Sequence, residues 1–314
     1  MSDANRIILH HYDASPYAEK IRLALRLKNL AWSSVTIPMI MPKPDLTALT
    51  GGYRKTPVMQ IGADIYCDTE IILAELERRF SIPSLNLPGH EGLSGMVAAW
   101  AASWFQDSVG IVFGLMADKL PSEFIEDRRA MNKGELDIET IKRAVPMLQD
   151  KWRANLMLLE KRLSGGQTTG SGDFMIGGKP GLVDVQAYFN IWWMSKSVSD
   201  FMSDCFETAP LTQDWFQRLE KMSGQAPEEM TAETALEIAH AAAPRLKPAS
   251  TAGELRDLQP GERVAIAPAD IGQDWVEGEL VVANSERVII SRRDDRAENL
   301  HVHFPRAGYL LRSL

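Results

Sequence analysis

The order of strand-like and helix-like segments in residues 5–79 constrains the fold more than any other feature of the sequence. RIILHHY is typical of a strand, SPYAEKIRLALRLK of a helix, and WSSVTIP of a second strand. After the proline-broken segment MPKPDLTALTGGYRK come two short strands, PVMQIG and DIYC, and then the helix DTEIILAELERRF. The resulting order, βαβαββα, predicts a compact α/β unit of about 80 residues.

The rest of the chain contains two further regions. SIPSLNLPGHEG has no clear period and predicts a linker, whereas residues 92–245 are apolar at every third or fourth position, which predicts helices. From residue 250 onward, short strands alternate with turn residues, which predicts a small SH3-like β-barrel of about 60 residues. We therefore expect an α/β domain (1–81), a linker (82–91), an all-helical domain (92–245) and a small β-barrel module (250–314).

Composition excludes several classes of protein. The chain has 314 residues and a net charge of −8, which argues against a general nucleic-acid binder, because such a protein needs a basic surface for phosphates. Its two cysteines, Cys67 and Cys205, lie far apart in the sequence, which excludes a disulfide framework and fits a reducing cytosol. His301 and His303 share a strand face, but no third ligand is evident, so we expect no metal site.

The sequence shows no targeting or membrane segment. The N-terminal stretch MSDANRII has neither a basic region nor a long apolar run, so it does not look like a signal peptide. The longest apolar stretch, MVAAWAASWF, is much shorter than the ~20 residues that a bilayer span needs. We therefore expect a cytoplasmic protein that binds neither membranes nor nucleic acids.

Ser15 opens the first predicted helix, in the stretch DASPYAEKIRLAL. Serine followed by Pro16 is a strong helix start, since serine accepts hydrogen bonds from the first amides and proline fits the first helical position. The same geometry puts a hydroxyl at a helix N-terminus, where the dipole favours an anion such as a thiolate. Ser15 is therefore either a cap alone or a group that also lowers the pKa of a bound thiol.

The segment Lys55-Thr56-Pro57-Val58 precedes a short strand and has two interpretations. In the structural one, proline is simply the first residue of the strand, where its missing amide does no harm. In the functional one, Pro57 follows a cis peptide bond and the turn leaves the backbone of Val58 free to pair with a peptide-like ligand.

Asp68 and Thr69 come directly before an apolar helix. Either residue is a suitable helix cap. A helix N-terminus with free amides and a hydroxyl also suits a ligand carboxylate, and the Asp68 carboxylate suits a ligand ammonium. Capping and ligand binding both remain open for this pair.

Taken together, these motifs resemble the thioredoxin-like N-terminal domain of glutathione transferases. SPYAEKIRLAL looks like the omega and tau classes, in which Cys or Ser precedes Pro-Phe or Pro-Tyr at the same distance from an Ile/Val-Arg pair. Downstream, FMIGGKPGLVDVQAYF resembles the family's buried capping segment, with Asp184 matching its aspartate and Gly181 standing where Ser or Thr is usual. The resemblance covers residues 5–244. It implies an α/β thioredoxin-like domain and an all-α glutathione-transferase domain, to which the β module is an addition.

The resemblance also implies glutathione as co-substrate and a role for each motif. Ser15 would hydrogen-bond the glutathione sulfur. Tyr12 is the rival catalytic residue, because tyrosine-type classes place their tyrosine near the end of the first strand. The spacing to Ile21-Arg22 matches His11 better than Tyr12, which favours Ser15.

The remaining motifs are implied to hold the rest of glutathione. Val58, beside a cis-Pro57, would pair with the cysteinyl backbone, and Lys55 would take the glycyl carboxylate. Asp68 and Thr69 would hold the γ-glutamyl end, although the family usually has Glu or Gln, followed by Ser, at these two positions. The full implied glutathione-binding set is Lys55, Thr56, Pro57, Val58, Asp68 and Thr69.

The electrophile is expected to lie against the helical domain. Trp100, Trp104 and Phe105 are close together on one predicted helix. An aromatic stripe of this kind is more often part of a core than of a pocket. The candidate pocket residues are Tyr17, Trp100, Trp104 and Phe105.

The resemblance leads to three functional hypotheses. The first is a detoxifying glutathione transferase that delivers the thiolate to a small apolar electrophile. The second is a non-catalytic binding protein with the transferase fold, in which residues 250–314 dock a protein partner. The third is a glutathione-dependent isomerase or dehalogenase on the same scaffold. The resemblance further implies a homodimer.

Overall fold

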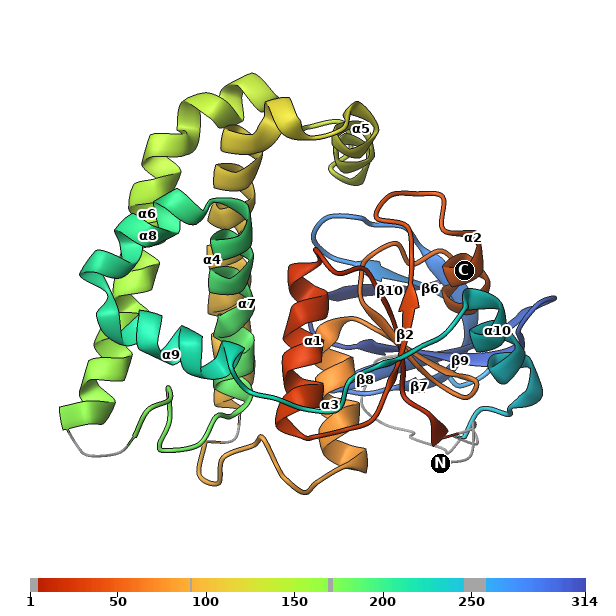
Figure 1. The fold of residues 1–314 in the computed structure, drawn as a ribbon. Coiled ribbons are helices and arrows are strands. Elements are labelled where there is room, and N and C mark those ends of the chain that lie inside the picture. The colour runs from red at the N-terminus through yellow and green to blue at the C-terminus, as the bar shows by residue number, and fades with distance from the viewer. Residues whose placement is uncertain (1–4, 91, 169–171, 246–257) are drawn as a thin grey trace.

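The computed structural model describes residues 5–90, 92–168, 172–245 and 258–314. Figure 1 shows a lobe of long helices on one side and a lobe built on a β-sheet on the other. Helices α1 and α3 lie between the sheet and the long helices.

The N-terminal unit follows the predicted order and has the thioredoxin-like fold. β1 pairs in parallel with β2 and antiparallel with β3, which pairs antiparallel with β4. Successive strand residues face opposite sides of the sheet. Leu9 and Met59 therefore pack toward α1 and α3, whereas Ile8 and Val58 pack on the opposite face with α2. The elements are β1 (Ile8–His11), α1 (Pro16–Leu27), β2 (Ser33–Thr36), α2 (Pro44–Thr50), β3 (Val58–Ile61), β4 (Asp64–Cys67) and α3 (Thr69–Arg79).

The helical lobe is all-α, as predicted. The Asp184 carboxylate accepts hydrogen bonds from Met175 N, Gly181 N and Trp215 Nε1, at 2.9, 2.9 and 2.7 Å. A Cβ at Gly181 would lie 3.0 Å from Leu85 O, so close packing explains glycine at this cap. The elements are α4 (Leu93–Met116), η2 (Ala117–Lys119), α5 (Ser122–Met131), α6 (Ile138–Thr168), α7 (Leu182–Ser197), α8 (Ser199–Thr208) and α9 (Pro210–Glu220).

After α9 the chain leaves the helical lobe, which the sequence did not predict. β5 (Glu228–Glu229) pairs in parallel with β2, and α10 (Ala232–Ala241) packs on the sheet. The helix itself was predicted, but it was placed in the helical domain. Ala235, Leu236 and Ala239 join a core shared with α2 and the C-terminal strands. Periodicity identifies an apolar helix face but not the surface that buries it.

The C-terminal strands extend the N-terminal sheet. β6 to β9 form an antiparallel meander, and β10 returns to pair with β6. β9 also pairs in parallel with β4, so the described residues form one ten-stranded sheet of order β10-β6-β7-β8-β9-β4-β3-β1-β2-β5. The predicted β module is thus present but is joined to the sheet, and its SH3-like closure stays a prediction. Residues 250–257 of that predicted module lie outside the described residues. The strands are β6 (Arg263–Pro268), β7 (Val276–Ala283), β8 (Arg287–Asp294), β9 (Glu298–Pro305) and β10 (Tyr309–Ser313).

The polar residues singled out on β9 pack against β4. His303 Nε2 lies 3.0 Å from Asp64 Oδ1, and its ring stacks on Tyr66. Among the described residues, no group of three or more His, Cys, Asp and Glu side chains is placed to hold a metal ion. Within the same described ranges, no helix combines the length and the apolar character that crossing a membrane requires.

Candidate functional site

The three predicted motifs meet at one end of the sheet. β1 leads into the loop that carries Ser15, β3 begins directly after Pro57, and β4 ends at Cys67. The register places His10 opposite Val58, and Val58 opposite Cys67. Because β3 is antiparallel to both neighbours, its start lies beside their ends. Motifs that are far apart in the sequence are therefore adjacent in space.

Ser15 caps α1 in a way that leaves its proton available. Its Oγ accepts a hydrogen bond from Ala18 N at 3.1 Å, and Pro16 is the first helical residue. A serine hydroxyl has one proton and two lone pairs, so accepting this bond does not use its donor. The side chain is nevertheless covered, since Ser15 is only 2% exposed. The capping bond is therefore compatible with thiol binding, whereas the low exposure of Ser15 works against it.

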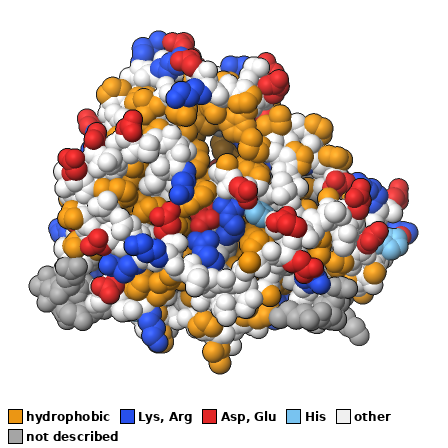
Figure 2. Space-filling view, viewed as in Figure 1, with side chains coloured by type: hydrophobic (Ala, Val, Ile, Leu, Met, Phe, Trp, Pro, Cys, Tyr) orange, Lys and Arg blue, Asp and Glu red, His pale blue; other side chains and the backbone are white. Residues whose placement is uncertain are grey.

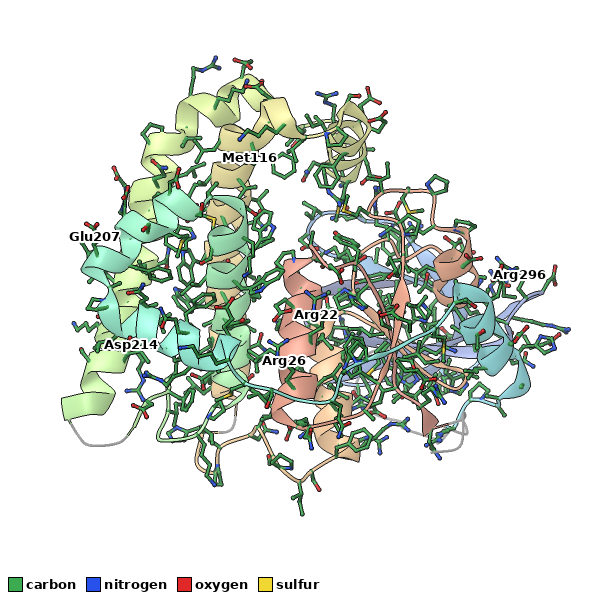
Figure 3. All side chains as sticks on the ribbon, in the orientation of Figure 1. Arg22, Arg26, Met116, Glu207, Asp214 and Arg296 are labelled. Carbon is green, nitrogen blue, oxygen red and sulfur yellow. The ribbon has the colours of Figure 1, made fainter. Side chains whose placement is uncertain are left out.

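The loop between β1 and α1 is fixed by α1 itself. Arg22 Nη2 donates to Asp13 O at 2.9 Å, and Arg22 Nη1 lies 3.0 Å from His11 Nδ1. Figure 3 labels Arg22 and Arg26 on α1, and both guanidinium groups bind the buried Glu19 carboxylate at 2.7 Å. Charged side chains of the same segment therefore stabilise the start of α1.

Tyr12, the rival catalytic residue, lies in different surroundings from Ser15. Lys43 Nζ is 6.0 Å from the centre of the Tyr12 ring, which packs at the edge of the core shared with α2. Tyr17, in the first turn of α1, instead packs against Phe105 of the helical lobe, with 5.1 Å between ring centres. Tyr12 therefore belongs to the α2 side of the sheet, whereas the start of α1 faces the helical lobe.

The Thr56–Pro57 peptide bond is cis, as the functional interpretation requires. Val58 is fully buried and has strand partners on both sides, His10 and Cys67. The N–H and C=O of a strand residue point to one side of the strand, and at Val58 a neighbouring strand lies on either side. This corrects the prediction that the backbone of Val58 is free to pair with a ligand. Thr56 lies outside any strand and is half-buried, so its backbone is the better candidate at this edge.

Asp68 and Thr69 open α3, where they gather charged partners. Asp68 Oδ1 accepts a hydrogen bond from Glu70 N at 2.9 Å, and burial raises the pKa of Asp68. The φ of Asp68 is 98°, a strained conformation of a kind that clusters at functional sites. Lys20 Nζ donates to Thr69 Oγ1 at 3.1 Å and pairs with Glu70 at 2.7 Å. A carboxylate, a hydroxyl and an ammonium thus stand between the starts of α1 and α3.

The C-terminal β module reaches two of the predicted site residues. Tyr309 OH donates to Asp68 Oδ2 at 3.0 Å. Lys55 Nζ pairs with Asp270 Oδ1 at 2.5 Å, and the side chains are 19% and 61% exposed. The first contact is half-buried, whereas the second lies at the surface.

A hollow lies beyond the N-terminal end of α1. Figure 2 shows hydrophobic side chains around it, and Figure 1 places it between α4, α5 and the sheet lobe. Phe113 of α4 stacks with Phe124 of α5 at 6.1 Å, and Figure 3 labels Met116 at the end of α4. Arg54 ties the sheet lobe to Asp127 of α5 at 2.8 Å. The start of α1 therefore lies next to an apolar hollow.

The aromatic residues predicted for the pocket fall into two groups. Phe105 contacts Tyr17 and therefore lies next to the start of α1. Trp104 is fully buried, with ring centres 5.1 Å from Trp100 and 4.9 Å from Trp152. Adjacent residues on a helix point in different directions, so Trp104 and Phe105 have different neighbours. Trp104 belongs to the core of the helical lobe and is not a pocket residue, whereas Trp100 is half-buried beside it.

A surface cavity of about 310 Å³ lies elsewhere, beside α10. Figure 3 labels one of its residues, Arg296, on the side of the sheet lobe away from α1. None of the predicted site residues lines this cavity. Its lining residues are Glu233, Leu236, Glu237, His240 and Arg296.

Sequence reasoning missed four polar residues at the site. Lys20 and Glu70 each lie near the start of a helix whose first residues were already candidates, so helix position was the available signal. Asp270 and Tyr309 carry no comparable signal. They come to the site only because β9 pairs with β4.

Two protein-family patterns match the chain: the glutathione S-transferase N-terminal domain over residues 9–84 and the C-terminal domain over residues 123–222. A solved structure of a GST-like protein from Pseudomonas syringae is 34% identical, with a TM-score of 0.72, and the match covers 99% of this chain and 100% of that chain. The chain belongs to the glutathione S-transferase family. Because the match spans nearly the whole chain, it includes the β module of this transferase-family protein.

Other glutathione S-transferases share the fold over a smaller part of the chain. One from Methylobacterium radiotolerans, solved in complex with glutathione sulfonate, is 19% identical with a TM-score of 0.51, covering 71% of this chain and 97% of that chain. A tau-class enzyme from mango, Mangifera indica, is 16% identical with a TM-score of 0.53, covering 74% of this chain and 97% of that chain. A comparison with curated proteins finds no match.

Proposed function

We propose that this protein is a glutathione transferase in which the Ser15 hydroxyl stabilises the glutathione thiolate for attack on an apolar electrophile. The supporting observation is that Ser15 Oγ accepts from Ala18 N, which leaves its proton to donate to sulfur. The dipole of α1 favours the same thiolate. Lowering a thiol pKa from ~8.5 by one or two units corresponds to about 1.4–2.7 kcal/mol, which one charge-assisted hydrogen bond and a helix end can supply.

The rest of glutathione has partners of matching charge. The Asp68 carboxylate suits the γ-glutamyl ammonium, while Thr69 and the positive end of the α3 dipole suit the adjacent carboxylate. Lys55 suits the glycyl carboxylate, which must compete with Asp270 for it. The cysteinyl backbone suits Thr56, immediately before the cis-Pro57.

The proposed reaction transfers a group without oxidation or reduction. The thiolate sulfur forms a bond to an electrophilic carbon, and the leaving group departs with its electron pair. Phe105 and Tyr17 offer an apolar wall beside the start of α1. Burial raises the pKa of Tyr17, so its hydroxyl stays protonated and does not act as the base. Removal of small apolar electrophiles is the physiological role that this chemistry supports.

Three substitutions at Ser15 separate its two roles. Ser15→Ala removes the cap and the hydroxyl, whereas Ser15→Gly removes the hydroxyl at a capping cost of only a few tenths of a kcal/mol. Ser15→Thr keeps both. We expect Ala and Gly to raise the pKa of bound glutathione by about one unit or more, followed by thiolate absorbance, and Thr to keep it low. A Gly variant with the wild-type pH–rate profile would show that Ser15 is only a cap.

A non-catalytic glutathione-binding protein is the second candidate. It is favoured by the low exposure of Ser15 and by the contacts that the β module already makes to Lys55 and Asp68. Calorimetry of glutathione binding, combined with thiolate absorbance, distinguishes the two functions. Glutathione binding accompanied by thiolate formation supports the transferase, whereas binding without thiolate supports the second candidate.

We further propose that the protein is a homodimer, which light scattering of the purified chain tests. A cytoplasmic location fits its two buried cysteines, neither of which forms a disulfide. An isomerase or dehalogenase would use the same thiolate, so substrate screening decides between the chemistries.

A docking role for residues 250–314 receives less support, because Val264, Ile290 and Phe304 share a buried core with Ile8 and Val58.

A further inference from the structure

Strand pairing brings Tyr309 to the glutathione site. β9 runs parallel to β4, with Tyr66 opposite His303, so both strands end at the same edge of the sheet. A short turn then leads to Tyr309, the first residue of β10, which pairs with Pro268 at the end of β6. The last two strands of the chain thereby deliver a tyrosine to the start of α3.

The Asp68 carboxylate is held from two sides. Glu70 N donates to Oδ1 at 2.9 Å, and Tyr309 OH donates to Oδ2 at 3.0 Å. Each carboxylate oxygen has a further acceptor site beyond the one already used. Two fixed donors therefore set the orientation of the carboxylate while leaving it able to accept from a ligand ammonium.

The direction of the tyrosine hydrogen bond is fixed by its surroundings. Tyr309 OH has a second partner, Tyr53 OH, at 3.1 Å. An ionised carboxylate only accepts, so Tyr309 donates to Asp68 and accepts from Tyr53. Burial raises the pKa of both tyrosines well above the usual value, so both keep their protons. Phe304 packs against both rings, with ring centres 6.0 Å from Tyr53 and 5.6 Å from Tyr309.

We propose that Tyr309 is a positioning residue of the glutathione site, which holds the Asp68 carboxylate in the orientation that binds the γ-glutamyl ammonium. This inference rests on the proposed function, since it assumes that glutathione places its ammonium at Asp68. It gives the C-terminal β module a role in ligand recognition that does not require a protein partner.

Two tyrosine variants of the full chain test the proposal by calorimetry. Tyr309→Phe removes the donor to Asp68 and keeps the ring, and we expect it to weaken glutathione binding about five- to tenfold. Tyr53→Phe is the matched control, because it removes the other hydroxyl and leaves the Tyr309–Asp68 contact in place. We expect Tyr53→Phe to change affinity less than about twofold.

Two further readouts exclude a merely structural effect. Tyr309→Phe should move the acid limb of glutathione binding to higher pH, because the ionised carboxylate loses a donor. It should not weaken binding of glutaryl-cysteinyl-glycine, a glutathione analogue without the γ-glutamyl amino group. Equal weakening for both ligands, or by both tyrosine variants, overturns the positioning role. If the wild type binds no glutathione, the proposed function fails and this inference fails with it. If the wild type binds and Tyr309→Phe binds equally well, only the inference fails.

Discussion

The two ends of the candidate site are built in different ways. The thiol end is built from one short segment of the chain. Ser15 accepts a hydrogen bond from Ala18 N, and Arg22 donates one to the backbone of the same segment. At the other end, Lys55 and Asp68 take partners from the C-terminal β module, far away in the sequence. The thiol end therefore needs only a helix start, whereas the other end depends on the pairing of β9 with β4.

The residues proposed for chemistry and those proposed for ligand recognition therefore depend on different parts of the structure. The group that would stabilise a thiolate is set by local capping, which persists as long as α1 forms. The groups that would recognise the amino and carboxyl ends of glutathione are set by tertiary structure. Changes to the β module should therefore alter affinity before they alter the chemistry of the sulfur.

The largest expected effect comes from removing residues 258–314. The truncated chain loses the strand beside β4 and much of the core around Ile8, Val58 and Phe304, so we expect it to be insoluble or unfolded. Soluble yield and circular dichroism measure this, and co-expression of residues 258–314 as a separate chain is the control. A truncated protein that melts like the full chain would contradict the view that one end of the site depends on the module.

A smaller effect concerns pH and the thiol end. Burial is the main reason that the pKa of His10 and of His11, both on β1, falls from 6.5 to about 4. Between these values the unfolded chain binds protons that the folded chain does not, so stability is present above pH 6.5 and is lost as pH falls toward 4. For His10 the loss is about 3 kcal/mol, measurable by urea unfolding across this range.

A pair of variants checks that assignment. His10→Gln should make the unfolding free energy less dependent on pH, with the contribution of His11 remaining, whereas His240→Gln, at an exposed position on α10, should leave the dependence unchanged. An unchanged slope in His10→Gln would mean that His10 does not contribute to the acid sensitivity.

The smallest effect is expected at the surface pair Lys55–Asp270. Such exposed pairs contribute only about 0–1 kcal/mol, so a ligand carboxylate can displace Asp270. Asp270→Asn should therefore tighten glutathione binding about two- to fourfold, and added salt should reduce the gain. Asp274→Asn is the matched control on the same loop, since its carboxylate lies 3.8 Å from Arg54 instead. Weaker binding in Asp270→Asn would show that Asp270 contributes to the site and does not compete for it.

Features set by local contacts could be predicted from the sequence, whereas features set by tertiary contacts could not. Helix starts depend on nearby residues, so the cap at Ser15, the pair Asp68–Thr69 and the buried Asp184 were all placed correctly. Strand partners depend on the whole chain, which is why the backbone of Val58 was wrongly taken to be free. The same reason hid the return of α10 to the sheet and the arrival of Tyr309 at Asp68. Periodicity marks a buried face, but the partner of that face is a tertiary property.

The parallel pairing of β9 with β4 also has a consequence for synthesis. At ~5–20 residues per second, a ribosome finishes β9 roughly 10–50 s after β4 has been translated. During this interval β4 is an open sheet edge that can pair with another nascent chain. The domain made first is therefore completed by a strand made nearly last, and only a fully translated polypeptide acquires the native sheet.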